Sequence, residues 1–539
     1  MSPTSSPSSR AASIAWLILA VAVLCGAAWW WQIGRPVALP DAPSARIACV
    51  SYAPFRKPGE TPLDPHAFVS PERIDADLKA LSERFDCVRT YSQGFGLSAV
   101  PGIAQKYGMK VLMGIWLGRD KNLNDSEVAM GITTAKAHPE VIRGVIVGNE
   151  VLLRGEQSPE ALAGYITQVR DALKDEHVAV TYADVWEFWL RYPQMAKAVD
   201  YVTIHILPYW EDEPVPPQDA IKHVADVYAQ MKARFSGMPV MIGETGWPSE
   251  GRPRREASAS LVNEARYLRQ FLLYAGSVDM PYNVIEAFDQ PWKRDQEGTV
   301  GGYWGIFDVN AKPKFGMQGP VIEEPHWLAG WYAGVAGAVL FLLAGIWRRD
   351  LGYARSRGAL ALAGFATATS LAWQGRRMIF DNRNELEWVF TVVLCVLSLL
   401  TAIYLARRIA ARLAGAPINL PDRRLRFGWM FGLAFYDLLM VFDGRYRDFP
   451  LGLFWPPAVG FLIAAWMETR DNCVVPIIEE RFIAWALPLL AAVVVAQEIG
   501  LNPSTWLWLV VNFATAGAVM IEWRRALRKQ PNQSQAAHQ

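Results

Sequence analysis

Cysteine and histidine are scarce in this sequence, and neither residue type forms a metal-binding pattern. The chain has five cysteines and seven histidines among its 539 residues. It contains no CxxC pair, no HExxH motif and no glycine-rich phosphate-binding loop. These absences exclude the common zinc and nucleotide sites, so we expect an activity that needs no metal and no cofactor.

Two of the cysteines, Cys49 and Cys87, lie in neighbouring predicted strands. A disulfide between them is compatible with an oxidising compartment. Free cysteine is, however, among the residue types most often buried in protein cores. We therefore favour two buried free thiols over a disulfide at this place.

An excess of one charge is also missing. The chain carries 53 basic and 52 acidic residues, which gives a formal net charge of +1. Binding to nucleic acid needs clustered basic residues that neutralise phosphates. The sequence therefore argues against a nucleic-acid partner and fits a neutral substrate better.

Hydrophobic residues, in contrast, are abundant. They make up 52% of the chain and charged residues 19%, which is apolar for a soluble enzyme. An apolar run at 12–34 follows a polar segment at 1–11 and contains three consecutive tryptophans at 29–31. Its length fits a bilayer crossing, and no convincing signal-peptide cleavage site follows it. We expect an uncleaved membrane anchor rather than a signal peptide, and then a linker at 35–45.

The composition changes again after residue 320. Further apolar runs predict a membrane domain at 321–525 with about seven transmembrane helices, before a cytoplasmic tail at 526–539. Two of these runs are short, so we expect them to be tilted, re-entrant or extended. Asp437 lies in one of the short runs and marks either a functional site at membrane depth or a position near the interface. The runs lie at 327–347, 359–373, 386–405, 427–442, 451–467, 482–499 and 505–523.

Lysine and arginine are unevenly distributed over the loops between these runs. They are more frequent in the loops at 348–357, 407–426, 470–481 and 524–529 than in those at 376–383 and 445–447. The positive-inside rule then places both termini in the cytoplasm and the segment 46–320 outside it. We expect a multi-pass protein of the cell inner membrane, embedded in the lipid bilayer, with a periplasmic domain.

The segment 46–320 has the composition of a soluble α/β protein. Short β-branched runs alternate with longer amphipathic stretches, which is the rhythm of a (β/α)8 TIM barrel. Helices are expected between them, and Ser70 and Ser158 are predicted N-caps. An open doubly wound sheet is the alternative, but no Gly-x-Gly-x-x-Gly turn follows the first strand. The expected strands are 47–53, 87–92, 110–117, 141–149, 178–183, 201–207, 240–245 and 282–288, and the clearest helices are 71–85, 158–174 and 258–275.

Two of the expected strands end in a glutamate. Glu150 follows the strand 141–149, and Glu244 lies near the end of the strand 240–245. Strands four and seven face each other across the mouth of such a barrel, where active sites form. A retaining glycosidase needs two carboxyl groups about 5–5.5 Å apart at such a place. Either glutamate alone is equally explained by an ion pair or a helix N-cap, but the two together indicate catalysis.

These two strand ends resemble the signatures of glycoside hydrolase family 17. The segments are VGNE at 147–150 and GETGWPS at 243–249. The family is typified by β-1,3-glucanases, and the resemblance covers about 47–315. It implies that Glu150 is the acid/base, Glu244 the nucleophile and Asn149 the partner of the sugar 2-hydroxyl.

Further family-like segments supply aromatic candidates for substrate binding. They lie around Tyr52, at 89–91 and 205–209, and at 288–293 and 304–308. Sugar rings pack well on aromatic faces, but each of these rings is equally compatible with a place in the core. The candidates are Tyr52, Tyr91, Trp247, Trp292 and Trp304.

Polar residues near the expected site have two interpretations each. Tyr209 is expected to donate its hydroxyl to Glu244, with a structural hydrogen bond as the alternative. Lys293 either binds sugar hydroxyls or forms an ion pair with Glu286, and we count both among the substrate-binding candidates. His205 is expected to be structural rather than catalytic.

The sequence departs from the family pattern at two places. Gln290 stands where many members carry glutamate. The residues 301–303, before Trp304, are Gly-Gly-Tyr where an acidic residue and a histidine are common. These differences concern substrate subsites and leave both predicted catalytic carboxylates in place.

The sequence therefore predicts a retaining glycoside hydrolase or transglycosylase that acts on β-1,3-glucan. Poor solvation and the charge of Glu244 should raise the pKa of Glu150, whereas hydrogen bonds keep Glu244 ionised. Tethering to membrane helices slightly favours transfer over hydrolysis and is compatible with docking to a glucan synthase or exporter. The alternatives are a non-catalytic β-glucan-binding receptor and a glucan-export accessory protein.

Overall fold

The chain forms two compact units, each with its own hydrophobic core. The computed structural model describes residues 9–346, 354–416, 423–444, 447–468 and 475–528. The barrel unit comprises Pro36–Arg252 and Glu256–Val321. The helical unit comprises Met1–Arg35, Pro253–Arg255 and Ile322–Gln539.

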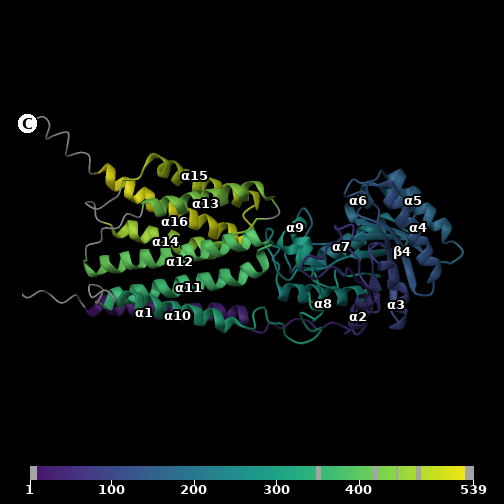
Figure 1. Ribbon diagram of the computed structural model, residues 1–539, viewed down its shortest axis with the longest axis horizontal. Coiled ribbons are helices and arrows are strands. Elements are labelled where there is room, and N and C mark those ends of the chain that lie inside the picture. Colours follow the sequence, from purple (N-terminus) through teal and green to yellow (C-terminus); the bar gives the residue numbers. More distant parts are fainter. Residues whose placement is uncertain (1–8, 347–353, 417–422, 445–446, 469–474, 529–539) are drawn as a thin grey trace, which may run out of the picture. The chain divides into compact units, whose positions relative to one another are not determined.

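The barrel unit contains a seven-stranded parallel sheet whose strands pair in the order of the sequence. Figure 1 shows the strands of this unit with helices packed around them. Most of its residues are β-branched or apolar, as a sheet covered on both faces requires. Seven of the eight expected strands are present close to their expected positions. They are β1 Val50–Ser51, β2 Cys87–Arg89, β3 Lys110–Ile115, β4 Ile142–Asn149, β5 Val180–Val185, β6 Val202–His205 and β7 Val240–Glu244.

The eighth expected strand, 282–288, is not a strand of this sheet. It makes single parallel bridges to Ile242 of β7 and to Val50 of β1. The partners of its later backbone N–H groups alternate between loops and β1. The N–H of Glu286 donates to the carbonyl of Trp304 at 3.0 Å, and that of Ala287 donates to the carbonyl of Ser51 in β1 at 2.9 Å. Because these partners are scattered, no continuous ladder forms, and the prediction of a regular eighth strand is wrong. The segment still bridges β7 and β1, and the arrangement is consistent with the (β/α)8 fold of glycosidases.

Helices connect successive strands, and the three with predicted bounds begin within three residues of their predicted starts. Ser70 and Ser158 cap α2 and α5, because each hydroxyl accepts the backbone N–H three residues further on. A proline in the first turn of both helices suits the helical backbone and removes an N–H that has no partner there. The helices are α2 Pro71–Ser82, α3 Val100–Lys106, α4 Lys121–Ala137, α5 Pro159–Ala172, α6 Trp186–Arg191, α7 Ala220–Arg234 and α8 Leu261–Ser277.

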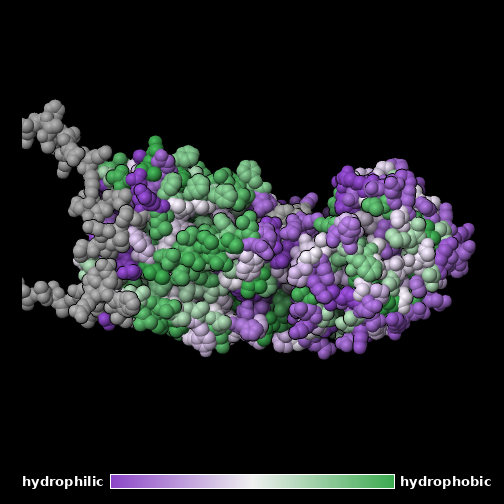
Figure 2. Space-filling model, viewed as in Figure 1, coloured by the Kyte–Doolittle hydropathy of each residue, from purple (hydrophilic) through white to green (hydrophobic). Residues whose placement is uncertain are grey.

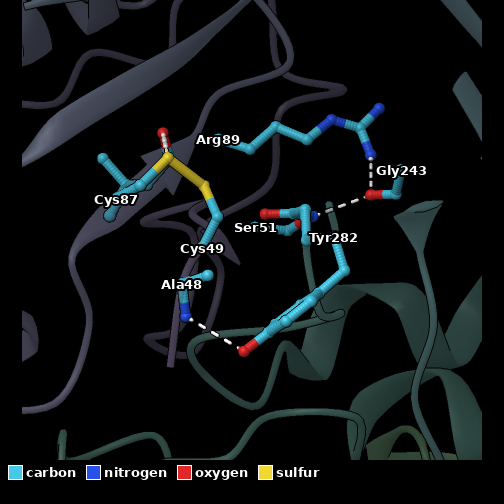
Figure 3. The surroundings of a disulfide bond; sticks show 9 residues. Ala48, Cys49, Ser51, Cys87, Arg89, Gly243 and Tyr282 are labelled. Atoms are coloured by element: carbon cyan, nitrogen blue, oxygen red, sulfur yellow. Dashed lines mark hydrogen bonds between the residues drawn. A yellow bond between two sulfur atoms is a disulfide. The ribbon is translucent and has the colours of Figure 1, made fainter. Parts of the chain in front are cut away.

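Cys49 and Cys87 form a disulfide (Figure 3). The expectation of two free thiols is therefore wrong. In the register of β1 and β2, Val50 lies opposite Val88. The residues that precede them, the two cysteines, consequently lie side by side, with their Cα atoms 4.3 Å apart. Strand register is a tertiary property, so the spacing of the cysteines along the chain could not reveal this pairing.

The described part of the helical unit consists mainly of eight α-helices. Five of them, α1, α10, α12, α13 and α16, have the length and apolar composition needed to cross a membrane. Helix α11 extends well beyond the short run that predicted it. The helices are α1 Ser9–Gly34, α10 Trp327–Ile346, α11 Ala354–Asp381, α12 Glu385–Ala414, α13 Arg423–Phe442, α14 Leu451–Met467, α15 Ile478–Gln497 and α16 Pro503–Leu527.

The two units differ in their surfaces. Figure 2 shows a broad apolar surface over the helical unit and a largely hydrophilic one over the barrel unit. On α12, for example, Leu386 is 78% exposed and Val389 62% exposed. Large exposed apolar surfaces are costly in water, which agrees with the predicted membrane domain. Insertion into a bilayer and its topology stay predictions, and the arginines at 348–349, 445 and 470 lie outside the described residues.

The interior of the helical unit holds ionisable side chains. Asp437 on α13 is fully buried, and one of its oxygens accepts a hydrogen bond from Nε1 of Trp508 at 2.6 Å. Arg426, at the start of α13, lies between the carboxylates of Glu480 and Glu522. All three members of this ion cluster are at most 2% exposed. Each charge of this ion cluster is thus paired, as burial demands.

Candidate active site

The two predicted catalytic carboxylates lie together at the C-terminal ends of their strands. Glu244 is the last residue of β7, and Glu150 directly follows β4. One carboxylate oxygen of each and a ring nitrogen of His205 lie within 4.8 Å of one another. Two carboxyl groups of retaining glycosidases are about 5–5.5 Å apart. The barrel therefore brings both glutamates within reach of one sugar carbon.

The backbone turns sharply at Glu150. This residue has a φ of +51°, in the left-handed region that few non-glycine residues adopt. Gly148, two residues earlier, has a φ of +83°. The N–H of Glu150 donates to the carbonyl of Ala183 on β5 at 2.8 Å. Strained conformations of this kind persist where surrounding contacts hold them, commonly at functional sites.

Glu244 is nearly buried but surrounded by donors. Its Oε1 accepts hydrogen bonds from Nη1 of Arg89 at 2.8 Å and from the hydroxyl of Tyr91 at 2.9 Å. Burial alone would raise the pKa of Glu244, but the neighbouring positive charge and these bonds outweigh it and lower the pKa. Burial lowers the pKa of His205 to about 4, so this ring is neutral near pH 7 and Arg89 supplies the charge. Glu244 is therefore an anion at neutral pH.

Glu150 has the opposite environment. Burial raises its pKa to about 8, and the negative charges of Glu244 and Asp184 add to this effect. Arg154 opposes it only in part. One carboxyl group is thus held as an acid and the other as an anion. These are the two states that a retaining glycosidase needs before the sugar is attacked.

Asn149 is oriented by two donors. Its Oδ1 accepts from Nη2 of Arg89 at 2.5 Å and lies 3.0 Å from Nε2 of His205. The imidazole therefore carries its hydrogen on Nε2, and the oxygen of the amide is fully used. The amide NH2 group of Asn149 is left as a donor for a sugar hydroxyl, which is the role that the family resemblance implies.

Glu286 and Lys293 form a buried ion pair beside the catalytic glutamates. Nζ of Lys293 lies 3.0 and 2.8 Å from the two oxygens of Glu286, which is fully buried. Of the two interpretations of Lys293, the structure shows the ion pair. Gln290 donates to the same carboxylate, and its own oxygen accepts from Nε1 of Trp292 at 2.8 Å. The residue that departs from the family pattern thus helps to hold this pair.

Three predicted sugar-stacking rings lie in the core instead. Tyr52 is fully buried, and its hydroxyl donates to Asp77 at 3.1 Å. Trp247 is 1% exposed, and its Nε1 donates to the carbonyl of Ser258 at 3.0 Å. Trp304 is 5% exposed. Their faces are covered by other side chains, so these three predictions are corrected to structural roles.

The hydrogen bond predicted from Tyr209 to Glu244 is made by Tyr91. Tyr209 is fully buried, and its hydroxyl donates to the carbonyl of Arg252. Its ring packs edge-on against Trp247 and Trp304. The predicted bond is absent because the Tyr209 hydroxyl donates its hydrogen to the carbonyl of Arg252, while the hydroxyl of Tyr91 reaches Glu244.

Residues that the sequence did not single out also shape the site. Arg89 belongs to the family-like segment 89–91 but was given no role from the sequence, and the structure shows that it joins Glu244 to Asn149. Trp116 follows β3 directly, is 38% exposed and stacks on the guanidinium of Arg154 at 4.3 Å. Its position just past a strand end could have marked it. Asp184, on β5, has no such signal.

The donor atoms of Glu150, His205 and Glu244 are also close enough together to ligate a cation. The guanidinium of Arg89, however, already places positive charge 2.8 Å from Glu244. His205 points its Nε2 hydrogen toward Asn149. The site therefore suits acid–base and nucleophilic chemistry of carboxyl groups better than metal binding.

Comparison with known proteins agrees with this geometry. Residues 49–305 match the family model of the BtgE/BtgC glycoside hydrolase domain. The glucan 1,3-beta-glucosidase of Schizosaccharomyces pombe is 25% identical, over 45% of this chain and 79% of the relative. That of Arthroderma benhamiae is 27% identical, over 45% of this chain and 83% of the relative.

A similar solved structure is an active-site mutant of the Rhizomucor miehei beta-1,3-glucanosyltransferase in complex with laminaritriose. It is 27% identical and covers 52% of this chain and 98% of its own, with a TM-score of 0.45. The family model and the curated relatives confirm the resemblance that the two strand-end motifs predict. Residues 49–305 are therefore similar to the BtgE/BtgC glycoside hydrolase domain, in agreement with the resemblance to glycoside hydrolase family 17.

Proposed function

We propose that this protein is a retaining glycoside hydrolase or transglycosylase of β-1,3-glucan that works through a covalent glycosyl-enzyme. The observation that carries the proposal is the pair Glu150 and Glu244, within 4.8 Å of each other and with pKa values moved in opposite directions. The glucan 1,3-beta-glucosidases among the relatives support the choice of substrate.

In the first step, the carboxylate of Glu244 attacks the anomeric carbon. Its Oε1 holds two hydrogen bonds, whereas Oε2 has no partner among the described residues and is the oxygen we assign to the attack. Glu150 gives its proton to the leaving glycosidic oxygen. The bond from carbon to that oxygen breaks, and the shortened glucan leaves with the proton.

In the second step, Glu150 acts as a base. It takes a proton from water or from the hydroxyl of another sugar, whose oxygen displaces Glu244 from the anomeric carbon. The amide of Asn149 holds the 2-hydroxyl of the same sugar during both steps. We favour a sugar as acceptor, because an enzyme tethered to membrane helices is better placed to remodel a glucan under export than to forage.

We further propose that the barrel unit lies outside the cytoplasm, on a protein anchored in the inner membrane. The Cys49–Cys87 disulfide supports an oxidising compartment for this unit. The apolar helices and the arginine-rich loops support a multi-pass membrane domain with cytoplasmic termini. Docking to a glucan synthase or exporter would explain why the chain has more apolar helices than a membrane anchor needs.

The test uses the full chain, purified in detergent and incubated with laminari-oligosaccharides. Mass spectrometry distinguishes hydrolysis, which gives only shorter sugars, from transfer, which also gives longer ones. Glu244→Gln and Glu150→Gln should each abolish both products. A wild-type protein that binds these sugars but neither cleaves nor transfers them would support the alternative, a non-catalytic glucan-binding or export accessory protein.

A further inference from the structure

The loop that carries Glu150 is fastened to β5 by hydrogen bonds. Three N–H groups of the loop 150–153 reach three consecutive residues of that strand. The N–H groups of Glu150, Leu152 and Leu153 donate to the carbonyl of Ala183, the hydroxyl of Tyr182 and the carboxylate of Asp184, at 2.8, 3.0 and 3.3 Å. We refer to the side chains of Tyr182 and Asp184 as the β5 clamp.

Asp184 is itself held firmly. It is fully buried, and its Oδ1 accepts the N–H of Val185 at 2.8 Å. Its Oδ2 accepts the hydroxyl of Tyr182 in addition to the N–H of Leu153. All these partners are donors, which suits a carboxylate rather than a neutral acid. The clamp therefore holds a fixed negative charge, the carboxylate of Asp184, next to the loop that carries Glu150.

The loop needs such a clamp because of its backbone conformation. Glu150 has a φ of +51°, which a non-glycine residue adopts only when its surroundings enforce it. If the clamp were released, the backbone could relax toward an ordinary conformation. The carboxyl group would then turn away from Glu244, although no residue that touches the sugar had been changed.

Charged groups approach Glu150 from several elements. Arg154, in the same loop, is paired with Glu156 at 2.6 Å, so its positive charge is shared. Glu244 and His205 belong to the reaction centre itself. These groups include Glu244 of β7, His205 of β6, Arg154 of the loop after β4, Glu297 at the end of α9 Arg294–Glu297, and Asp184 of β5. Asp184 is the acidic group of this set that is fixed on a strand and takes no part in the proposed reaction.

Resting on the proposed function, we infer that Asp184 is a positioning residue that aims Glu150 through the loop backbone and keeps it protonated through a fixed negative charge. Tyr182 shares the first task only. Its hydroxyl holds the N–H of Leu152 but carries no charge. The two side chains of the clamp therefore have separable effects.

Asp184→Asn and Tyr182→Phe separate these effects in the full chain purified in detergent. The readout is kcat and kcat/KM against pH, with a laminari-oligosaccharide as substrate. Removing the charge of Asp184 favours ionisation of Glu150, so the basic limb of the D184N profile should move to lower pH by about half a unit or more. Burial raises the pKa of Asp184 to about 6, so the two profiles should converge below that pH.

Tyr182→Phe should give the complementary result. It keeps the carboxyl group of Asp184 but loses the bonds of the hydroxyl to Leu152 and Asp184, so kcat should fall about tenfold while the basic limb moves much less than in D184N. Asp175→Asn, which removes the same charge at an exposed position, is the matched control and should change neither quantity. Circular dichroism and thermal unfolding establish that each variant is folded.

Failure of this inference can be told apart from failure of the proposed function. Full activity of Glu150→Gln would overturn the proposed function. The charge effect of Asp184 would be overturned if E150Q loses its activity as expected but the basic limb of the D184N profile does not move. A folded Y182F variant with wild-type kcat would overturn the positioning effect. If D184N does not fold, Asp184→Glu takes its place. This variant keeps the negative charge but changes the position of the carboxylate, so it must lower kcat without moving the basic limb.

Discussion

The hydroxyl of Tyr91 lies 2.9 Å from Oε1 of Glu244, the same oxygen that Arg89 reaches at 2.8 Å. Both donors come from β2 or the chain just after it. They stabilise the negative charge of Glu244 on one oxygen and orient the carboxylate. The other oxygen, Oε2, is left for the sugar.

Tyr91→Phe should therefore weaken the nucleophile. A hydrogen bond to a charged group contributes about 1.5–3 kcal/mol. Losing it raises the pKa of Glu244, so the acidic limb of kcat/KM should move to higher pH, and kcat should fall about tenfold or more. Steady-state kinetics between acidic and neutral pH measure both effects.

Tyr209→Phe is the matched control for this experiment. It removes a hydroxyl that bonds to the carbonyl of Arg252 and not to the carboxylate. Some loss of thermal stability is expected, with the acidic limb unmoved. An acidic limb that shifts in Y209F and stays in place in Y91F would reverse the assignment of the two tyrosines.

The wild-type enzyme should have a bell-shaped pH profile. Activity falls at low pH as Glu244 is protonated, and its lowered pKa keeps this limb acidic. Activity falls at high pH as Glu150, whose pKa burial raises to about 8, loses its proton. In Glu150→Gln the basic limb should disappear. A substrate with an activated leaving group, which needs no proton donor, should recover most of the first step.

Asn149→Ala should remove the recognition of the sugar 2-hydroxyl. Wild-type enzyme should act on a 2-deoxy substrate about 10- to 100-fold more slowly than on the normal one, because a polar group of the site is left unpaired. In N149A, this penalty should largely vanish. An unchanged penalty would show that another side chain binds the 2-hydroxyl. The rates of the wild-type and N149A proteins on the normal and the 2-deoxy substrate form a double-mutant cycle.

Much of the fold follows from the sequence by local rules. The alternation of apolar strands and amphipathic helices sets the order β1 to β7, and Ser70 and Ser158 mark helix starts through their own hydroxyls. The segment 282–288 has the residues of a strand but lacks one partner along its whole length. Pairing across a closed barrel is decided by tertiary structure, so no local pattern reports it.

The site divides in the same way. Glu150 and Glu244 could be predicted because each stands at a strand end, where parallel strands deliver side chains to one rim. The exchange of roles between Tyr91 and Tyr209 could not, since both residues follow strands and differ only in the path of the loop. Asp184 gave no signal, because its importance lies in backbone groups of a neighbouring loop.

Reduction of the Cys49–Cys87 disulfide should lower the stability of the barrel unit. The bond closes a loop with a sequence separation of 38 residues, for which chain entropy predicts about 4 kcal/mol as an upper value. Thermal unfolding with and without dithiothreitol should show a lower Tm for the reduced wild-type protein. A variant with Cys49→Ala and Cys87→Ala should match the reduced protein and no longer respond to the reductant.

Arg426→Met should destabilise the helical unit strongly, because it leaves Glu480 and Glu522 as buried charges without their shared cation. Breaking a buried pair in this way costs about 3–5 kcal/mol, whereas replacing all its members by apolar residues of similar size is often neutral. The triple variant with Glu480→Met and Glu522→Met should therefore recover much of the loss in thermal unfolding of the detergent-purified chain. Arg407→Met, at an exposed position of α12, is the control and should leave the Tm nearly unchanged. A triple variant less stable than R426M alone would show that these carboxylates are held by contacts other than the arginine.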